Sequence, residues 1–442
     1  MVSRVAVRKS VTCEVHLLNQ GRLFDVEAKK THHLGLGAHV DSETSPPSPT
    51  PSTEVTFRPS AFASTTGIFI LMGAVTSLFG PLLVSFTHRF HLSLPSAGAA
   101  LSVYFVGATL GVLPGWLGLK RLQGRLVLSS SLIVIVVGAA GASISHSWVL
   151  FLASVFLIGL GFGALDIGLN TLLARTALKG RAHRLSVSSA GYGVGAVICP
   201  LVIIGLNPNN FRFLFAGLAL IALVLTMLNG GLHAPPLRTE ALQLEITKMK
   251  AQRRPILLTF IMAYVFYVAL ETSSSGWMAT QLHAVGYSES SGSLVTAGFW
   301  TGVAIGRLLG GPLYHRLSEK KLVLGGLVLA TVVCATAFSD TLAPYAYPIL
   351  GLIIASIFPM GLMWYTMLCP HDSDGLSFLI LFMMVGGVAG PAIISLLVSQ
   401  FGVHVVPFTL ASYAVIDLAI FLSALRFRPL VFGSGSLMTR SI

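Results

Sequence analysis

Charged side chains are scarce in this sequence. Asp, Glu, Lys and Arg together make up 10% of its 442 residues, and Asp and Glu number only 16. Soluble domains carry about 25% charged residues, so an ordinary water-soluble fold is excluded. Cysteine is also rare. Its four copies are scattered without a Cys-x-x-Cys pair, which predicts neither a disulfide framework nor a metal site.

Motifs of catalysis and of nucleic-acid binding are missing too. The sequence contains no Gly-x-x-x-x-Gly-Lys-Ser/Thr loop for a nucleotide and no His-Glu-x-x-His pair for a catalytic metal. The net charge of +12 and the pI near 9.8 fit contact with anionic lipid headgroups better than contact with nucleic acid. We therefore expect no enzyme activity, no cofactor, no metal and no nucleic-acid partner.

Apolar residues are abundant instead. They make up 54% of the chain, and the mean hydropathy is +0.81. A helix needs roughly 20 apolar residues to cross a bilayer, and runs near that length recur along the chain. The runs lie at 62–86, 97–119, 126–144, 149–172, 187–205, 213–232, 256–279, 292–314, 322–338, 344–364, 376–398 and 405–425. The sequence therefore predicts an all-α, multi-pass membrane protein with twelve transmembrane helices.

Lys and Arg gather in alternate connections between these runs. Cationic clusters follow the second, fourth, sixth and eighth runs, whereas the odd-numbered connections hold little beyond Arg89 and Arg212. Lys and Arg resist translocation across the membrane. We therefore expect both termini in the cytoplasm, and we assign the chain to the cell membrane.

The apolar runs divide the chain into five parts. Residues 1–60 are polar and include a Ser/Thr/Pro-rich stretch, which predicts a disordered cytoplasmic tail. A wrongly chosen start of the coding sequence is an equal explanation of this composition. The first ten residues lack the apolar segment of a secretory signal, so no cleavage is expected. The remaining parts are a six-helix bundle at 61–232, a basic cytoplasmic linker at 233–254, a second six-helix bundle at 255–428 and a cytoplasmic tail at 429–442.

The two halves of the chain repeat each other. An offset of 195 residues lays Phe105, Gly107, Gly111, Gly115 and Arg121 onto Trp300, Gly302, Gly306, Gly310 and Arg316. Glycines four apart share one helix face and let a neighbouring backbone approach closely. The glycine-containing runs at 187–205 and 376–398 also correspond. A duplicated six-helix unit with a site near the midplane is the architecture of a rocking transporter.

A short loop at 115–125 joins the second and third runs, and 310–321 repeats it in the second half. Both copies are similar to the signature cytoplasmic loop of the major facilitator superfamily, although the acidic position after the glycine is missing in each. Over 62–428 the chain resembles that superfamily. The resemblance implies two pseudo-symmetric six-helix bundles whose first, fourth, seventh and tenth helices line a cavity.

Three further segments resemble the fucose-permease-like sugar branch of that superfamily. The segments read GLGFGALDIGLN at 159–170 with SAGYGVGA at 189–196, YVALETSSSGW at 267–277 with FWTG at 299–302 and GR at 306–307, and FP at 358–359. Relatives often carry His where this chain has Ser189, so no role of an imidazole there transfers to this chain.

Asp166 and Glu271 are carboxyl groups in the middle of apolar runs. Such a position costs about 2.5 to 3.5 kcal/mol on insertion scales and marks a substrate, ion or proton path. Asn170 follows Asp166 by four residues, shares its helix face and is a candidate for substrate binding. Removal from water favours the uncharged form of a carboxyl group, so both acids are candidates for proton coupling. The alternative is a structural carboxylate bonded to helix-end amides or loop cations.

Four more residues are candidates for substrate binding. Ser274 begins a stretch of low helix propensity, 274–276, which predicts a break in the seventh helix and free backbone groups for a polar ligand. Trp277 offers a face for a sugar ring, or belongs to the aromatic belt at the membrane interface. Trp300 stacks on substrate or fills the interface between the bundles. The sugar-branch resemblance adds Tyr192.

Two further charged residues lie within the runs. Arg307 is expected to form a gating ion pair with Asp166 or Glu271, or else to extend to the cytosolic rim. Asp417, in the twelfth run, is assigned to packing or to an interhelical hydrogen bond.

Together these features predict a secondary active transporter. We expect alternating access that moves a small polar solute, of monosaccharide type, with protons. The expected partners are the solute, protons and the lipid bilayer, and the chain is expected to be a monomer. One alternative is a proton-driven exporter of hydrophobic drugs or metabolites, which predicts a cavity rich in Met and Phe. Another is a receptor or membrane enzyme on the same scaffold.

Overall fold

The computed structural model describes residues 56–57, 59–174, 181–206, 210–229, 232–234, 253–314, 316–370 and 372–429. The predicted tail at 1–60, the linker at 233–254 and the tail at 429–442 therefore lie almost entirely outside the described residues. The described part consists of helices and one pair of two-residue strands.

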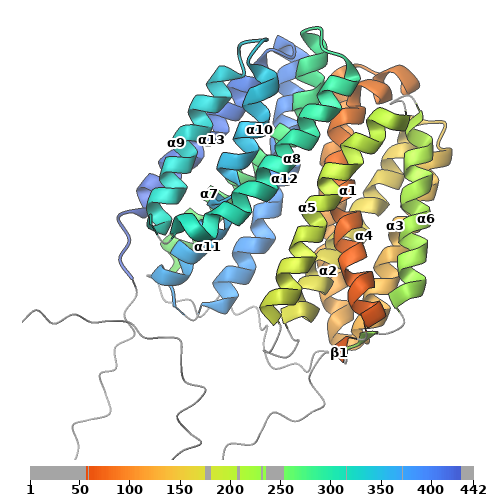
Figure 1. Cartoon of the computed structure of the whole chain (residues 1–442), viewed down its shortest axis with the longest axis horizontal. Helices are drawn as coiled ribbons and strands as arrows, with labels where there is room; N and C mark the ends of the chain where they lie inside the picture. Colours follow the sequence, from red (N-terminus) through yellow and green to blue (C-terminus); the bar gives the residue numbers. More distant parts are fainter. Residues whose placement is uncertain are drawn as a thin grey trace, which may run out of the picture. The chain divides into compact units, whose positions relative to one another are not determined.

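Six helices form the first bundle, on the right in Figure 1. They are α1 (Pro59–Phe90), α2 (Leu94–Arg121), α3 (Gly124–Ile144), α4 (Trp148–Ala174), α5 (Arg181–Leu206) and α6 (Phe211–Leu228). The antiparallel strands β1 (Thr56–Phe57) and β2 (Leu232–His233) join the segment before α1 to the segment after α6. A hydrogen bond from the Ser64 hydroxyl to the Leu225 carbonyl, 3.2 Å long, links the same two helices.

Seven helices form the second bundle, on the left in Figure 1. They are α7 (Arg253–Ala284), α8 (Glu289–Tyr314), α9 (Glu319–Thr336), α10 (Ala343–Ile354), α11 (Ile357–Leu368), α12 (Ser373–Phe401) and α13 (Val405–Ala424). Helices α10 and α11 form a single apolar span, Ala343–Leu368. The thirteen described helices therefore form twelve helical units, nine of which are long and apolar enough to cross a membrane, and this confirms the predicted all-α membrane fold with two six-helix bundles.

The tenth span is interrupted at Ala355 and Ser356, where the chain is not helical. Pro359 lies four residues beyond Ala355 and has no N–H group to donate to the Ala355 carbonyl. The missing hydrogen bond accounts for the place of the break. The sequence-based expectation of a break in the seventh span is wrong, because α7 continues through residues 274–276. Those residues are buried among neighbouring helices, and packing outweighs their low helix propensity.

The repeated glycines bring helices into close contact, as the sequence predicts. A Cβ atom at Gly107 or Gly111 of α2 would overlap backbone carbonyl oxygens of α4. A Cβ atom at Gly302 or Gly306 of α8 would overlap carbonyl oxygens of α10 in the same way. The two halves therefore use equivalent glycines for equivalent helix pairs, which confirms the pseudo-symmetric repeat.

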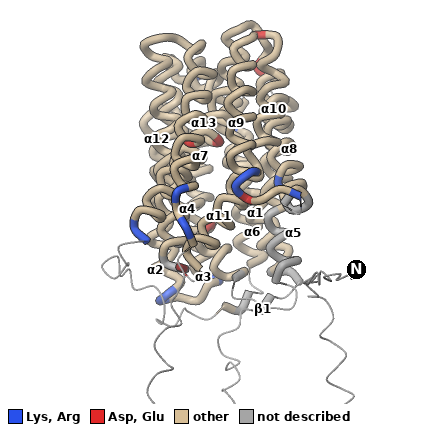
Figure 2. Tube along the Cα trace, turned by 90° about the vertical axis from the view of Figure 1, so that its left-hand side faces the viewer, with Lys and Arg blue, Asp and Glu red and all other residues tan. Residues whose placement is uncertain are grey.

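The described Lys and Arg residues gather mainly at one end of the helices, shown at the bottom of Figure 2. We call this end, where α2 ends and α7 begins, the basic end, and the other the opposite end. The segregation follows the charge pattern of the sequence. The assignment of the basic end to the cytoplasm rests on that pattern and stays a prediction.

Candidate functional site

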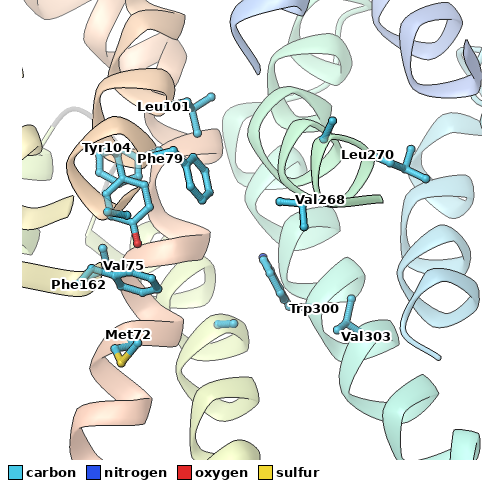
Figure 3. Packing of buried hydrophobic residues seen from close by; sticks show 14 of the residues in the cluster. Met72, Val75, Phe79, Leu101, Tyr104, Phe162, Val268, Leu270, Trp300 and Val303 are labelled. Atoms are coloured by element: carbon cyan, nitrogen blue, oxygen red, sulfur yellow. The ribbon is translucent and has the colours of Figure 1, made fainter. Parts of the chain in front are cut away.

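A cavity of about 470 Å³ lies between the two bundles. Its walls come from α1, α2, α4 and α5 of the first bundle and from α7, α8, α11 and α12 of the second. Figure 3 shows Leu101 and Phe162 on the first-bundle side and Val268 and Trp300 on the second-bundle side. The first, fourth, seventh and tenth spans all contribute, as the family resemblance implies.

Asp166 lies on the first-bundle wall of the cavity together with Asn170. One turn of α4 separates the two, and the Asn170 side-chain amide donates a 3.0 Å hydrogen bond to the Asp166 carboxylate. The same amide nitrogen lies 3.0 Å from the Asp166 carbonyl oxygen. This geometry confirms the predicted shared helix face. Within the described residues, the Asp166 carboxylate has no ion pair with a cation.

Glu271 lies on the second-bundle wall, on α7. Its carboxylate oxygen is 3.5 Å from a guanidinium nitrogen of Arg307 on α8. The side chain of Glu271 is 14% exposed and that of Arg307 is 42% exposed, and both line the cavity. The ion pair is therefore open to the cavity and is not enclosed by packed side chains. Of the two predicted partners of Arg307, the structure therefore selects Glu271. Arg307 does not extend to the basic rim.

Tyr192 and Trp300 meet across the bundle interface, and both line the cavity. Their ring centroids are 6.2 Å apart at an interplanar angle of 70°, an edge-to-face contact. The Tyr192 hydroxyl donates to Thr76 at 2.9 Å, and the Trp300 indole donates to Ser275 at 3.1 Å. These bonds hold both aromatic rings in one orientation. Trp300 therefore both packs between the bundles and presents a surface to the cavity.

Ser274 and Trp277 are placed away from the cavity wall. Both are fully buried, and neither is among the lining residues. The Trp277 indole packs against Gly98 of α2 so closely that a Cβ atom at Gly98 would overlap the ring. The Ser395 hydroxyl of α12 lies close to the same Cβ position. The expectation that Trp277 belongs to an interfacial belt is wrong, because its ring is enclosed by helices. In this conformation neither residue is positioned to touch a solute in the cavity.

Several wall residues were missed by the sequence reading. Thr76, Thr272 and Ser275 add hydroxyl groups, and Tyr267 adds a phenol one turn of α7 before Glu271. The i, i+4 spacing of Tyr267 and Glu271 is a signal that could have found this residue. Phe and Met side chains from α1, α2, α4, α11 and α12 complete the lining. These could not be told from ordinary core residues in the sequence.

Asp417 lies outside this site, in α13, and is 0% exposed. In the described part of the chain, neither oxygen of its carboxyl group has a hydrogen-bond partner. The packing role expected from the sequence agrees with this burial, whereas the hydrogen-bond role does not. Across the described ranges, no group of three or more His, Cys, Asp or Glu side chains is placed to hold a metal ion.

The bundles meet on the opposite-end side of the cavity. The Ser395 hydroxyl of α12 donates to the Pro95 carbonyl of α2 at 2.6 Å. The Ser85 hydroxyl of α1 donates to the Glu289 carboxylate of α8 at 3.4 Å. Both bonds cross the bundle interface near the opposite end. The cavity walls of α4, α11 and α12 lie toward the basic end instead.

Two bundles of six spans around a central cavity are the arrangement that the sequence resemblance implies. Residues 65–368 match the family model of the Major Facilitator Superfamily. The chain belongs to the major facilitator superfamily. The match covers 304 of the 442 residues, counted from 65 to 368. The chain is therefore a membrane transporter by family, and not an enzyme.

Curated members of the superfamily resemble this chain at low identity. The glucose/galactose transporter of Brucella abortus biovar 1 (strain 9-941) is 24% identical over 371 residues, which are 78% of this chain and 89% of that protein. Protein TsgA of Salmonella paratyphi B (strain ATCC BAA-1250 / SPB7) is 23% identical over 243 residues, 54% of this chain and 61% of that protein.

Solved superfamily structures share the fold. A D-xylose-proton symporter matches with a TM-score of 0.69 at 16% identity, over 85% of this chain and 98% of that chain. A bacterial homologue of the human lysosomal transporter Spinster, inward-facing and unoccupied, also matches with a TM-score of 0.69 at 16% identity, over 84% and 98%. At such identities the likeness shows the fold alone.

Proposed function

We propose that this protein moves a small, sugar-like polar solute across the cell membrane by alternating access, and that proton movement drives it. One observation carries the proposal. Acidic side chains from both bundles, Asp166 and Glu271, face one cavity, and a cation, Arg307, neutralises only Glu271 among the described contacts. Ionisable groups at membrane depth that line a cavity mark solute and proton pathways.

The cavity suits a small polar solute in size and chemistry. Its volume of about 470 Å³ lies inside the range of roughly 300 to 1,000 Å³ that is usual for small-molecule sites. Hydroxyl, amide and carboxylate groups on both walls can bond to the hydroxyls of a sugar. The Trp300 side chain offers apolar surface for the ring of the sugar. The names of the relatives, a glucose/galactose transporter and a D-xylose-proton symporter, support both the solute class and the coupling ion.

The contacts between the bundles support alternating access. The helices touch near the opposite end through Ser395 and Pro95 and through Ser85 and Glu289, while the cavity lies toward the basic end. A rocking motion of one bundle against the other would break these contacts and close the basic end. In this proposal the structure is the state that is open toward the cytoplasm.

The coupling step in this proposal is an exchange at Glu271. A proton on the Glu271 carboxylate removes the negative charge that holds Arg307, so the guanidinium group can turn to a solute hydroxyl or to Asp166. Loss of the proton restores the 3.5 Å ion pair. Asp166, held by Asn170, is the second proton-binding group of the proposal.

Uptake into proteoliposomes with an imposed pH gradient tests this function. Radiolabelled glucose, galactose, xylose and fucose are screened with the wild type, Glu271→Gln and Asp166→Asn. Each variant removes a carboxylate but keeps its size. We expect wild-type accumulation of at least one sugar above equilibrium. The Glu271→Gln protein should still exchange that sugar between equal concentrations but should not accumulate it.

Asp340→Asn is the matched control, because this Asp is exposed in the connection between α9 and α10 at the opposite end. It should accumulate sugar like the wild type. The proposed coupling is refuted if Glu271→Gln and Asp166→Asn both accumulate sugar normally. The proposed solute class is refuted if none of the four sugars enters under any gradient while the protein is folded.

Export of hydrophobic compounds is a second candidate, and one observation favours it. Phe69, Phe105, Phe162, Met383 and Met384 all line the cavity, and together they form a large apolar surface. Met is adaptable and frequent at promiscuous binding surfaces. Drug resistance on expression, with energy-dependent efflux of lipophilic cations and no sugar accumulation, would select this function. The polar groups on both walls make it the weaker candidate.

A further inference from the structure

A second, smaller cavity lies between the bundles at the opposite end. Its volume is about 240 Å³. The last turns of α1, the connection to α2 and the first residue of α2 form one wall, and the last turns of α7 form the other. Each bundle therefore supplies one wall, and the proposed sugar site does not include this space.

Four polar side chains that can donate hydrogen bonds line this second cavity, together with the apolar residues Val84, Leu92, Leu94 and Ala284. His88 comes from the first bundle and His283 from the second, and both are exposed to solvent. Thr280 contributes a hydroxyl from α7. The remaining hydroxyl, that of Thr87, already donates to the Val84 carbonyl at 2.6 Å. The lining contains no acidic side chain among the described residues.

Thr280 is the buried polar group of this wall. Its side chain is 2% exposed, and its hydroxyl oxygen has no hydrogen-bond partner within the described ranges. Buried polar groups in folded proteins are nearly always bonded, so an unsatisfied one needs an explanation. Thr280 lines the cavity, so a ligand bound there could accept a hydrogen bond from the Thr280 hydroxyl.

The start of α2 adds a second feature of an anion site. This helix of 28 residues begins at Leu94, beside the cavity, and its N-cap Ser93 makes no side-chain bond to the N–H groups of the first turn. The Ser93 hydroxyl is instead 2.9 Å from that of Ser96. Pro95 has no N–H group, so Leu94 and Ser96 supply the first N–H groups of α2 that lack a partner inside the helix. Such groups carry a partial positive charge that attracts anions.

The charges around the cavity favour an anion. Arg89 and His91 adjoin His88 in the chain but do not line the cavity. The acid that the structure places nearby is Glu289, at the start of α8, and it accepts the hydrogen bond from Ser85 one turn deeper in the interface. Asp340, in the connection between α9 and α10, is another described acid at the opposite end, and neither it nor Glu289 lines the cavity.

We propose that this cavity is a binding site for a small oxyanion, either phosphate or the phosphate group of a lipid. The oxyanion is held by His88, His283, the Thr280 hydroxyl and the start of α2. The volume lies below the range of roughly 300 to 1,000 Å³ that is usual for drug-sized ligands, which suits a compact ion with its waters. The bound anion bridges the bundles, so it stabilises the state in which their opposite-end halves are together.

Thermal unfolding of the purified full-length chain tests this site. Sodium phosphate is titrated at constant ionic strength, and dihexanoyl phosphatidic acid is titrated separately, to distinguish a free ion from a lipid headgroup. We expect the wild type to be stabilised by at least one of the two. His88→Ala, His283→Ala and Thr280→Val should each weaken the apparent affinity about tenfold, as loss of a hydrogen bond to a charged group does.

His146→Ala is the control, because His146 is another exposed histidine at the opposite end and does not line the cavity. It should bind like the wild type. Because His88 and His283 are exposed, their replacement should leave the unliganded unfolding temperature unchanged, which separates binding from misfolding. Equal stabilisation of all variants by the anion would overturn the proposal, and so would the lack of stabilisation of the wild type by either probe.

Discussion

Replacement of Arg307 by Gln is the sharpest test of the cavity geometry. The change leaves the Glu271 carboxylate without the cation that now lies 3.5 Å away. At that distance and an effective dielectric constant of about 20, the attraction between two unit charges is about 5 kcal/mol. The side chain of Arg307 is 42% exposed, so water screens much of this energy. We expect a destabilisation of about 1 to 2 kcal/mol, below the roughly 3 to 5 kcal/mol of a fully buried pair.

A double-mutant cycle measures the pair itself. Thermal unfolding is recorded for the wild type, Arg307→Gln, Glu271→Gln and the double variant in the same detergent. Arg307→Gln should unfold a few degrees lower than the wild type. The double variant should be more stable than the sum of the two single effects predicts, by about 1 kcal/mol, because it leaves no unpaired charge.

Arg316→Gln is the control, because Arg316 is exposed just beyond α8 at the basic end. It should unfold at the wild-type temperature. Additive effects of Arg307→Gln and Glu271→Gln would show that the two side chains do not interact. That result would refute the ion pair and the coupling step built on it.

Two further stability predictions follow from helix contacts. Gly111→Ala should destabilise the protein by about 1 to 3 kcal/mol, because the new Cβ atom would overlap the Leu160 carbonyl. Gly217→Ala is the control, because nothing lies within 4 Å of its Cβ position. This control should be neutral or slightly stabilising. Thermal unfolding distinguishes them, and equal effects would contradict the close α2–α4 packing. Tyr264→Phe should cost about 1 kcal/mol through loss of the 2.5 Å hydrogen bond to the Phe358 carbonyl. An unchanged unfolding temperature would show that this bond contributes nothing to holding α11 against α7.

The span count and the repeat were predictable because both depend on local composition. The length of an apolar run shows whether a helix can cross the membrane. Glycines spaced four residues apart form a helix face that a neighbouring helix can approach closely, as Gly107 and Gly111 do. The pairing of Asp166 with Asn170 was predictable for the same reason, since helix periodicity alone places them on one face.

The failures involve residues whose neighbours come from distant parts of the chain. The low helix propensity after Glu271 suggested a break, but burial against other helices keeps α7 continuous. The sequence predicts that Trp277 contacts a ligand or lies at the membrane interface, whereas its ring packs on Gly98, which is 179 residues away in the sequence (277 − 98 = 179). The choice of Glu271 over Asp166 as the partner of Arg307 likewise depends on how α7, α8 and α4 are placed in space.

Proton movement during solute entry tests the central claim most directly. Proteoliposomes with a trapped pH-sensitive dye receive the transported sugar from outside, with no pH gradient imposed at the start. Our account predicts that sugar entry acidifies the lumen with the wild type, and that Glu271→Gln, in liposomes loaded with the same sugar, exchanges it without acidification. Sugar entry through the wild type at a constant lumenal pH would contradict proton coupling through this cavity.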